Sequence, residues 1–225
     1  MNEEVRPLND LRLKTPRAAA VAGILFAVLN ITANVLIRLS IPPDPANGDF
    51  WLEERAKTVA LGLSLVPISG IAFLWFIGVV RDRMGQLEDR FFSSVFFGSG
   101  LLYLAMTFVS AALAGGLLTS YTLEPDLLIT SGIYTFSREV IFNITNVYAI
   151  RMAGVFMISL GTISVRTRIM PRWLSFLTYS LALVLLVSIG LNLWVTLIFP
   201  AWVLVVSLYI LALNLHIKDA GAEDT

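Results

Sequence analysis

Apolar residues dominate six long stretches of the chain, and polar segments separate them. Each stretch has close to the ~20 residues that an α-helix needs to cross the hydrocarbon core of a bilayer. The pattern predicts membrane-spanning helices at Ala18–Ser40, Thr58–Val80, Phe91–Leu118, Val140–Val165, Trp173–Leu191 and Thr196–Leu215. The expected fold is therefore all-α, a polytopic membrane protein built as a bundle of six transmembrane helices.

Basic residues are distributed unevenly between the two sides of this bundle. Eleven Lys and Arg residues lie in the N-terminal arm, the second and fourth connections and the C-terminal tail, against four in the other connections. Basic residues in short loops stay preferentially on the cytoplasmic side. We expect residues 1–225 to form a single six-helix transmembrane domain, with a cytoplasmic arm at 1–17 and a cytoplasmic tail at 216–225.

The two longer connections on the opposite side have their own signals. In the first, Pro42, Pro43 and Pro45 force an extended exit, and Asp49 can cap a short interfacial helix that follows it. The second, roughly Thr119–Glu139, is the longest and is expected to fold over the bundle as a loop. Tryptophans near the predicted edges fit the aromatic belts of membrane proteins, at Trp51, Trp173, Trp194 and Trp202.

The amino-acid composition argues against several classes of protein and site. Hydrophobic residues make up 57% of the chain and the mean hydropathy is +0.79, well above the ~45–50% apolar share of soluble domains. The formal net charge is zero, so bulk electrostatics do not indicate a nucleic-acid partner. There is no cysteine, and His216 is the single histidine. We therefore expect no metal and no cofactor.

Three polar residues share one face of the first predicted helix. Asn30, Asn34 and Arg38 are spaced by four residues, so at ~100° per residue each lies only ~40° from the last. Two interpretations remain open. The asparagines hydrogen-bond to other helices while Arg38 reaches the headgroups, or the three residues form a solute-lining face.

The fourth predicted helix carries Asn143, Asn146 and Arg151. Arg151 precedes Val165 by fourteen residues, which places it ~21 Å from the cytoplasmic end and inside the hydrocarbon. An ionisable residue at that depth is by default a candidate functional residue. Arg151 can hold an outer connection down through an acidic residue, bind carbonyls of a broken helix, or bind an external anion or lipid phosphate.

These residues support a leading functional hypothesis, a small transporter or solute-binding protein with an outward-facing polar cavity. Its predicted ligand-binding residues are Arg151, Asn30, Asn34, Asn143 and Asn146. The expected partners are the lipid bilayer and an anionic small molecule or lipid headgroup. No catalytic residue is predicted, because no carboxylate cluster, metal-ligand set or nucleophile–base pair lies near the bilayer.

The alternative hypothesis is a non-catalytic accessory or scaffold subunit of a membrane complex. The third predicted helix has a patch of small residues at Ala111, Ala112, Ala114, Gly115 and Gly116. Small residues allow helices to approach closely in membranes. Such a face would bind a membrane-protein partner or a second copy of the chain.

Two segments near the C-terminus resemble uncharacterised multi-pass membrane proteins of bacteria. They are RMAGVFMISLGTISVRTRIMPRWLS, from Arg151 to Ser175, and FPAWVLVVS, from Phe199 to Ser207. The resemblance implies a bacterial inner membrane as the location. It implies no activity.

Overall fold

A computed structural model describes residues 15–41, 50–84, 90–167, 170–188 and 193–223, and it is helical throughout these segments apart from short turns. The chain is an all-α polytopic membrane protein. Five described helical segments are long and apolar enough to cross a membrane. The arm at residues 1–14, the prolines at 42–45 and the predicted helix cap at Asp49 lie outside the described residues.

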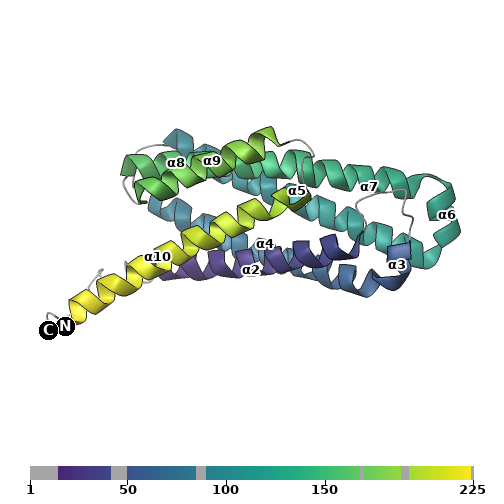
Figure 1. Ribbon diagram of the computed structural model, residues 1–225, viewed down its shortest axis with the longest axis horizontal. Coiled ribbons are helices and arrows are strands. Elements are labelled where there is room, and N and C mark those ends of the chain that lie inside the picture. Colours follow the sequence, from purple (N-terminus) through teal and green to yellow (C-terminus); the bar gives the residue numbers. More distant parts are fainter. Residues whose placement is uncertain (1–14, 42–49, 85–89, 168–169, 189–192, 224–225) are drawn as a thin grey trace, which may run out of the picture.

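The bundle is built from six segments that alternate in direction (Figure 1). Helices α2 (Thr15–Ser40), α5 (Arg90–Leu123) and α9 (Arg172–Val187) run one way. Helix α4 (Ala56–Met84), the continuous rod of α7 (Ile133–Asn143), η2 (Ile144–Ala149) and α8 (Ile150–Thr167), and α10 (Ile198–Glu223) run back. The start of α2 and the end of α10 consequently lie at the same end of the bundle.

Helix α9 is shorter than the sequence predicted. It has 16 residues and ends at Val187, because Ser188 takes an extended conformation with ψ 116°. At ~1.5 Å per residue it covers ~24 Å, less than the ~30 Å hydrocarbon core. The chain then returns through a 3-10 turn, η3 (Leu193–Leu197), into α10. Pro200 falls in the first turn of α10, where its missing N–H costs little.

The second outer connection is not a loop. Helix α5 continues to Leu123, α6 spans Pro125–Thr130, and α7 begins at Ile133 after a turn in which Gly132 has φ +76°. The expectation of a loop over Thr119–Glu139 was wrong, because a fall in hydropathy marks the membrane edge and not the end of the backbone hydrogen bonding. With 34 residues, α5 is ~50 Å long and projects beyond the hydrocarbon core.

Aromatic side chains fill the middle of the bundle. Phe73 lies 4.5 Å from Phe26, 5.5 Å from Tyr103 and 5.6 Å from Phe199 between ring centroids. Trp202, which the sequence placed in an outer belt, is 2% exposed and donates a 2.8 Å hydrogen bond from its indole nitrogen to Thr178 Oγ1 on α9. This core joins α2, α4, α5, α8 and α10.

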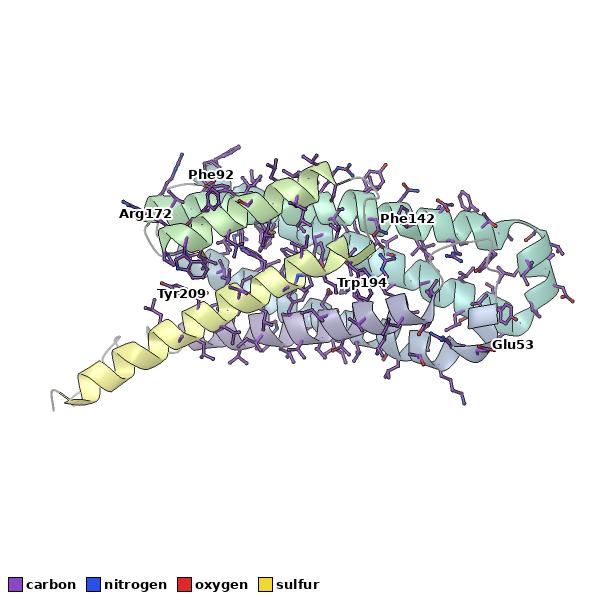
Figure 2. The ribbon with its side chains drawn as sticks, in the orientation of Figure 1. Glu53, Phe92, Phe142, Arg172, Trp194 and Tyr209 are labelled. Atoms are coloured by element: carbon purple, nitrogen blue, oxygen red, sulfur yellow. The ribbon has the colours of Figure 1, made fainter. Side chains whose placement is uncertain are left out.

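A smaller apolar cluster closes the end of the bundle opposite the two termini. Leu52 of the predicted interfacial helix, α3 (Phe50–Glu54), packs with Val59, Leu117, Leu128 and Tyr134. Arg55 donates a hydrogen bond to the carbonyl of Leu39. Glu53 marks this end in Figure 2, and Phe92 and Arg172 mark the other. Many apolar side chains between them project outward, as expected for a surface that contacts lipid.

Candidate functional site

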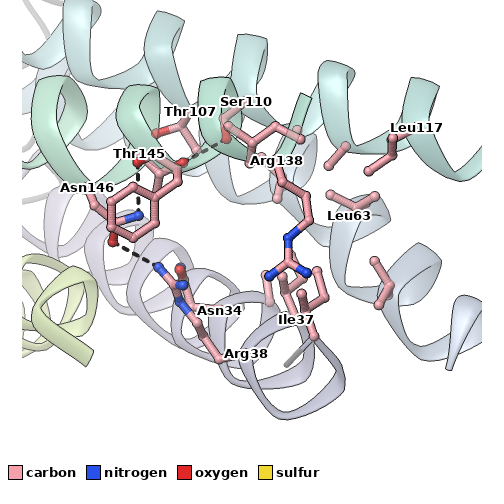
Figure 3. A pocket seen from close by; sticks show the side chains of 18 of the residues that line it. Asn34, Ile37, Arg38, Leu63, Thr107, Ser110, Leu117, Arg138, Thr145 and Asn146 are labelled. Atoms are coloured by element: carbon pink, nitrogen blue, oxygen red, sulfur yellow. Dashed lines mark hydrogen bonds between the residues drawn. The ribbon is translucent and has the colours of Figure 1, made fainter. Parts of the chain in front are cut away.

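A pocket of about 370 Å³ lies between α2, α4, α5 and the α7–η2 segment (Figure 3). Its volume equals that of ~12 water molecules at ~30 Å³ each, at the lower end of the range for small-molecule sites. Its polar lining residues are Asn30, Asn34, Arg38, Thr107, Ser110, Arg138, Glu139, Thr145 and Asn146.

Helix α2 contributes the face that its sequence predicted. Asn30, Asn34 and Arg38 all line the pocket, because the spacing of four residues keeps them on one side of an uninterrupted helix. Asn34 donates from its amide nitrogen to Asn30, at 2.9 Å to the carbonyl and 2.9 Å to the side-chain oxygen. The side-chain oxygen of Asn34 accepts no hydrogen bond from the described residues and remains available to a ligand or water.

Arg38 is the central charge of the pocket. Its side chain is half-buried, and it donates a 2.9 Å hydrogen bond to Oδ1 of Asn146. A guanidinium has five N–H donors, and this is the one hydrogen bond it makes within the described part of the chain. No carboxylate of the described residues pairs with it. Within the described residues, the positive charge of Arg38 is therefore not neutralised, and its side chain lines the pocket.

Asn146 is the partner that orients Arg38. Its amide nitrogen donates to the carbonyl of Phe142 at 3.0 Å, which leaves Oδ1 to accept from the guanidinium. Asn146 is 6% exposed. Beside it, the hydroxyls of Thr145 and Ser110 share a 2.7 Å hydrogen bond between η2 and α5. Both hydroxyls line the pocket, and the pair ties its wall together.

Thr145 and Asn146 lie in a π-helical segment, η2 (Ile144–Ala149). Such segments are uncommon and occur frequently at functional sites. The sequence did not predict it, because this stretch has no proline or glycine to mark an irregular turn. Sequence reasoning also missed Thr107, Ser110 and Thr145, since hydroxyl residues in helices commonly bond to their own backbone.

A second cation and a carboxylate lie nearer the outer end of the pocket. Arg138 donates a 3.0 Å hydrogen bond from Nη1 to the hydroxyl of Tyr134, in the outer apolar cluster. Its side chain extends across the pocket toward α2 (Figure 3). Glu139 also lines the pocket and is exposed. The two adjacent charges are of opposite sign.

Two of the five predicted ligand-binding residues are not among those that line the pocket. Asn143 is exposed and donates to the carbonyl of Glu139 at 2.9 Å. Arg151 is half-buried and donates to the carbonyl of Val147 in the π-helical segment at 2.7 Å. Five residues separate Arg151 from Asn146, which is ~140° around a regular helix, so similar depth does not give a shared face. Val147 belongs to the same continuous helical rod as Arg151, so this bond is a contact within one helix.

The aromatic core closes the pocket toward the centre of the bundle. Phe26 lies one turn deeper than Asn30, and Tyr103 one turn deeper than Thr107. Phe26 and Tyr103 are 1% and 7% exposed. Both rings pack against Phe73 and Phe199. The pocket therefore ends on a layer of aromatic side chains.

Comparison with known proteins adds no functional information. The sequence matches no protein-family model, and searches among curated proteins and solved structures gave no match. Within the described residues, no three or more His, Cys, Asp or Glu side chains are grouped to hold a metal ion. The function must therefore be inferred from the pocket itself.

Proposed function

We propose that this protein is a small, non-enzymatic transporter or solute-binding protein of a bacterial inner membrane, and that it binds a small anion in the pocket around Arg38. The observation that supports this proposal is the state of the Arg38 guanidinium. It is half-buried, it faces a pocket, and its one hydrogen-bond partner within the described residues is the neutral side chain of Asn146. A bound anion would supply the missing charge.

The depth of Arg38 favours a solute over a structural ion pair. Arg38 lies twenty residues beyond Ala18, ~30 Å along α2, near the far boundary of the hydrocarbon core. Asn146 lies twenty residues before Arg166 on its own helix, which is the same distance. The two hydrogen-bonded side chains therefore lie at the same depth when each is counted along its own helix. The charge pattern predicts that this boundary faces outward, where solutes enter from water.

A binding assay tests the site. The protein in lipid nanodiscs would be heated with acetate, benzoate, sulfate or inorganic phosphate, each at matched ionic strength. A ligand at one hundred times its Kd stabilises the folded state by ~2.7 kcal/mol, which is measurable as a rise in unfolding temperature. We expect at least one of these anions to produce such a rise in the native protein.

Two arginine variants form a matched pair. Arg38→Gln should abolish the anion-dependent rise, while Arg151→Gln removes a half-buried guanidinium outside the pocket and should leave the rise intact. Uptake of the stabilising anion into liposomes then separates a transporter from a binding protein. An equal response of the native and Arg38→Gln proteins, or no response to any anion, would contradict the proposed site.

A second candidate, an accessory subunit, has its own observation. Added Cβ atoms at Gly115 and Gly116 would meet no described atom within 4 Å, so the small-residue patch of α5 is not covered by this chain there. Gly116→Leu should then leave anion binding unchanged and displace a membrane-protein partner or second copy, seen as a change in assembly size on a native gel. An unchanged assembly would remove this candidate.

A further inference from the structure

The chemistry of the pocket changes along its length. Its inner part is polar and neutral, with Asn30, Asn34 and Asn146, and Arg38 lies just beyond them. Its outer part is walled by aliphatic side chains from three helices, namely Ile41, Val59, Leu63 and Leu117. Ile41 is eleven residues from Asn30, ~16 Å along α2. A solute that fills the pocket therefore meets Arg38 and the asparagines in the inner part, and aliphatic side chains beside Arg138 and Glu139 farther out.

Aliphatic side chains lie beyond Arg38 toward the outer end of the pocket. Two of them, Val59 and Leu117, also belong to the apolar cluster beneath α3 and α6. A ligand with a charged end and an apolar portion can place the first on Arg38 and the second against this aliphatic wall.

The charges of the lining indicate how many negative charges the ligand has. Arg38 contributes one positive charge near the inner part, and Arg138 and Glu139 contribute one charge of each sign farther out. The described lining thus has a net charge of one positive unit. A single negative charge neutralises it, whereas a dianion would leave excess charge in a partly desolvated site.

Starting from the proposed anion site, we infer that the ligand is a small organic monoanion with an apolar portion, such as a short-chain or aromatic carboxylate. Its carboxylate accepts hydrogen bonds from the Arg38 guanidinium. Its apolar portion packs against Leu63, Val59 and Leu117. The pocket volume of about 370 Å³ suits a single small molecule.

Binding of a graded series of anions tests this inference. Acetate, butanoate and hexanoate would be titrated by calorimetry into the full-length protein in phosphatidylcholine nanodiscs at pH 7, with empty nanodiscs to correct for partitioning. Each methylene that becomes fully buried should lower Kd by up to about fourfold. Hexanoate should therefore bind at least tenfold more tightly than acetate. Pentylamine, which has the same alkyl chain as hexanoate and the opposite charge, should not bind.

Two leucine variants separate the apolar wall from the charge. Leu63→Ala removes part of the pocket wall and should reduce the advantage of hexanoate over acetate while leaving the Kd of acetate within twofold. Leu61→Ala lies on the same helix, is 55% exposed and does not line the pocket. It should leave both constants unchanged.

The outcomes distinguish this inference from the proposed function. If inorganic phosphate binds in an Arg38-dependent manner and the Kd of carboxylates does not fall with chain length, the anion site stands and the organic ligand class is overturned. That ligand class is also overturned if Leu63→Ala leaves the chain-length dependence unchanged. If no anion binds, or Arg38→Gln binds hexanoate as the native protein does, the anion site itself is overturned.

Discussion

Asn146 controls how much of the Arg38 charge is available. Its Oδ1 accepts the 2.9 Å hydrogen bond from Arg38, and an aspartate is nearly the same size and shape. Asn146→Asp would place a carboxylate against the guanidinium and turn a bond between an ion and a neutral amide into an ion pair. An external anion would then compete with an internal one. We expect anion affinity to fall at least tenfold, measured by calorimetry, without loss of folded protein.

The chain supplies a close control for this change. Asn143 is three residues away on the same helix, is exposed, and does not line the pocket. Asn143→Asp adds the same charge to the same segment and should change the Kd less than twofold. Equal weakening by both variants would indicate a general electrostatic effect of the added charge and would contradict the role given to Asn146.

At the level of elements, the crossing of α2 and α10 depends on a glycine. A Cβ added at Gly23 would lie 2.0 Å from Oγ of Ser207 and 2.9 Å from a ring carbon of Phe76. Gly23→Ala should therefore destabilise the fold by about 1–3 kcal/mol, the usual effect of overpacking. The measurement is the unfolding temperature in detergent. Gly115→Ala, where the space is open, should change it little.

A variant of Ser207 tests whether the contact with its Oγ causes the loss of stability in Gly23→Ala. Its Oγ is buried and has no hydrogen-bond partner within the described residues. Ser207→Ala alone should be neutral or slightly stabilising, because it removes an unpaired polar atom. Combined with Gly23→Ala, it removes the closest clash and should recover much of the lost stability. A double variant as unstable as Gly23→Ala alone would show that Phe76, and not Ser207, limits the crossing.

The existence of the helices was predictable from hydropathy, and their ends were not. Helices α5 and α7 continue past the apolar stretches because a helix satisfies its backbone hydrogen bonds within itself, in water as in lipid. Helix α9 stops earlier than its apolar stretch because Ser188 leaves the helical conformation. Hydropathy reports where the hydrocarbon ends, and it contains little information about where the chain turns.

The candidate site was predictable where regular geometry extends along one helix. The spacing of Asn30, Asn34 and Arg38 placed all three on one face, although Arg38 was not among the predicted ligand-binding residues. Spacing does not predict which residues of different helices meet. The position of a residue along its helix gives its depth in the membrane, but it does not give the rotation of that helix about its own axis. Arg151 shows the consequence, since it lies at a suitable depth and donates to a carbonyl of its own helix.

On the scale of the whole molecule, the orientation of the bundle decides which solution the pocket faces. Basic side chains of the described residues lie on aromatic rings at the end opposite the pocket, with Arg81 4.2 Å from the Phe97 ring and Arg166 4.9 Å from the Phe92 ring. This end should be cytoplasmic, because the excess of Lys and Arg is there. The pocket would then face outward.

The absence of cysteine from the sequence makes this orientation directly measurable, since an introduced cysteine is the sole thiol. Thr130→Cys places it at the exposed end of α6, at the end of the bundle opposite the two termini, and Gln86→Cys places it between α4 and α5 in the sequence. A membrane-impermeant maleimide added to intact bacterial spheroplasts should label the first variant at once and the second only after permeabilisation.

The opposite labelling pattern would show that the pocket faces the cytoplasm, and anions would then have to be supplied from inside. Labelling of both variants in intact spheroplasts would mean that the chain inserts in both orientations, in which case the basic residues do not fix its direction.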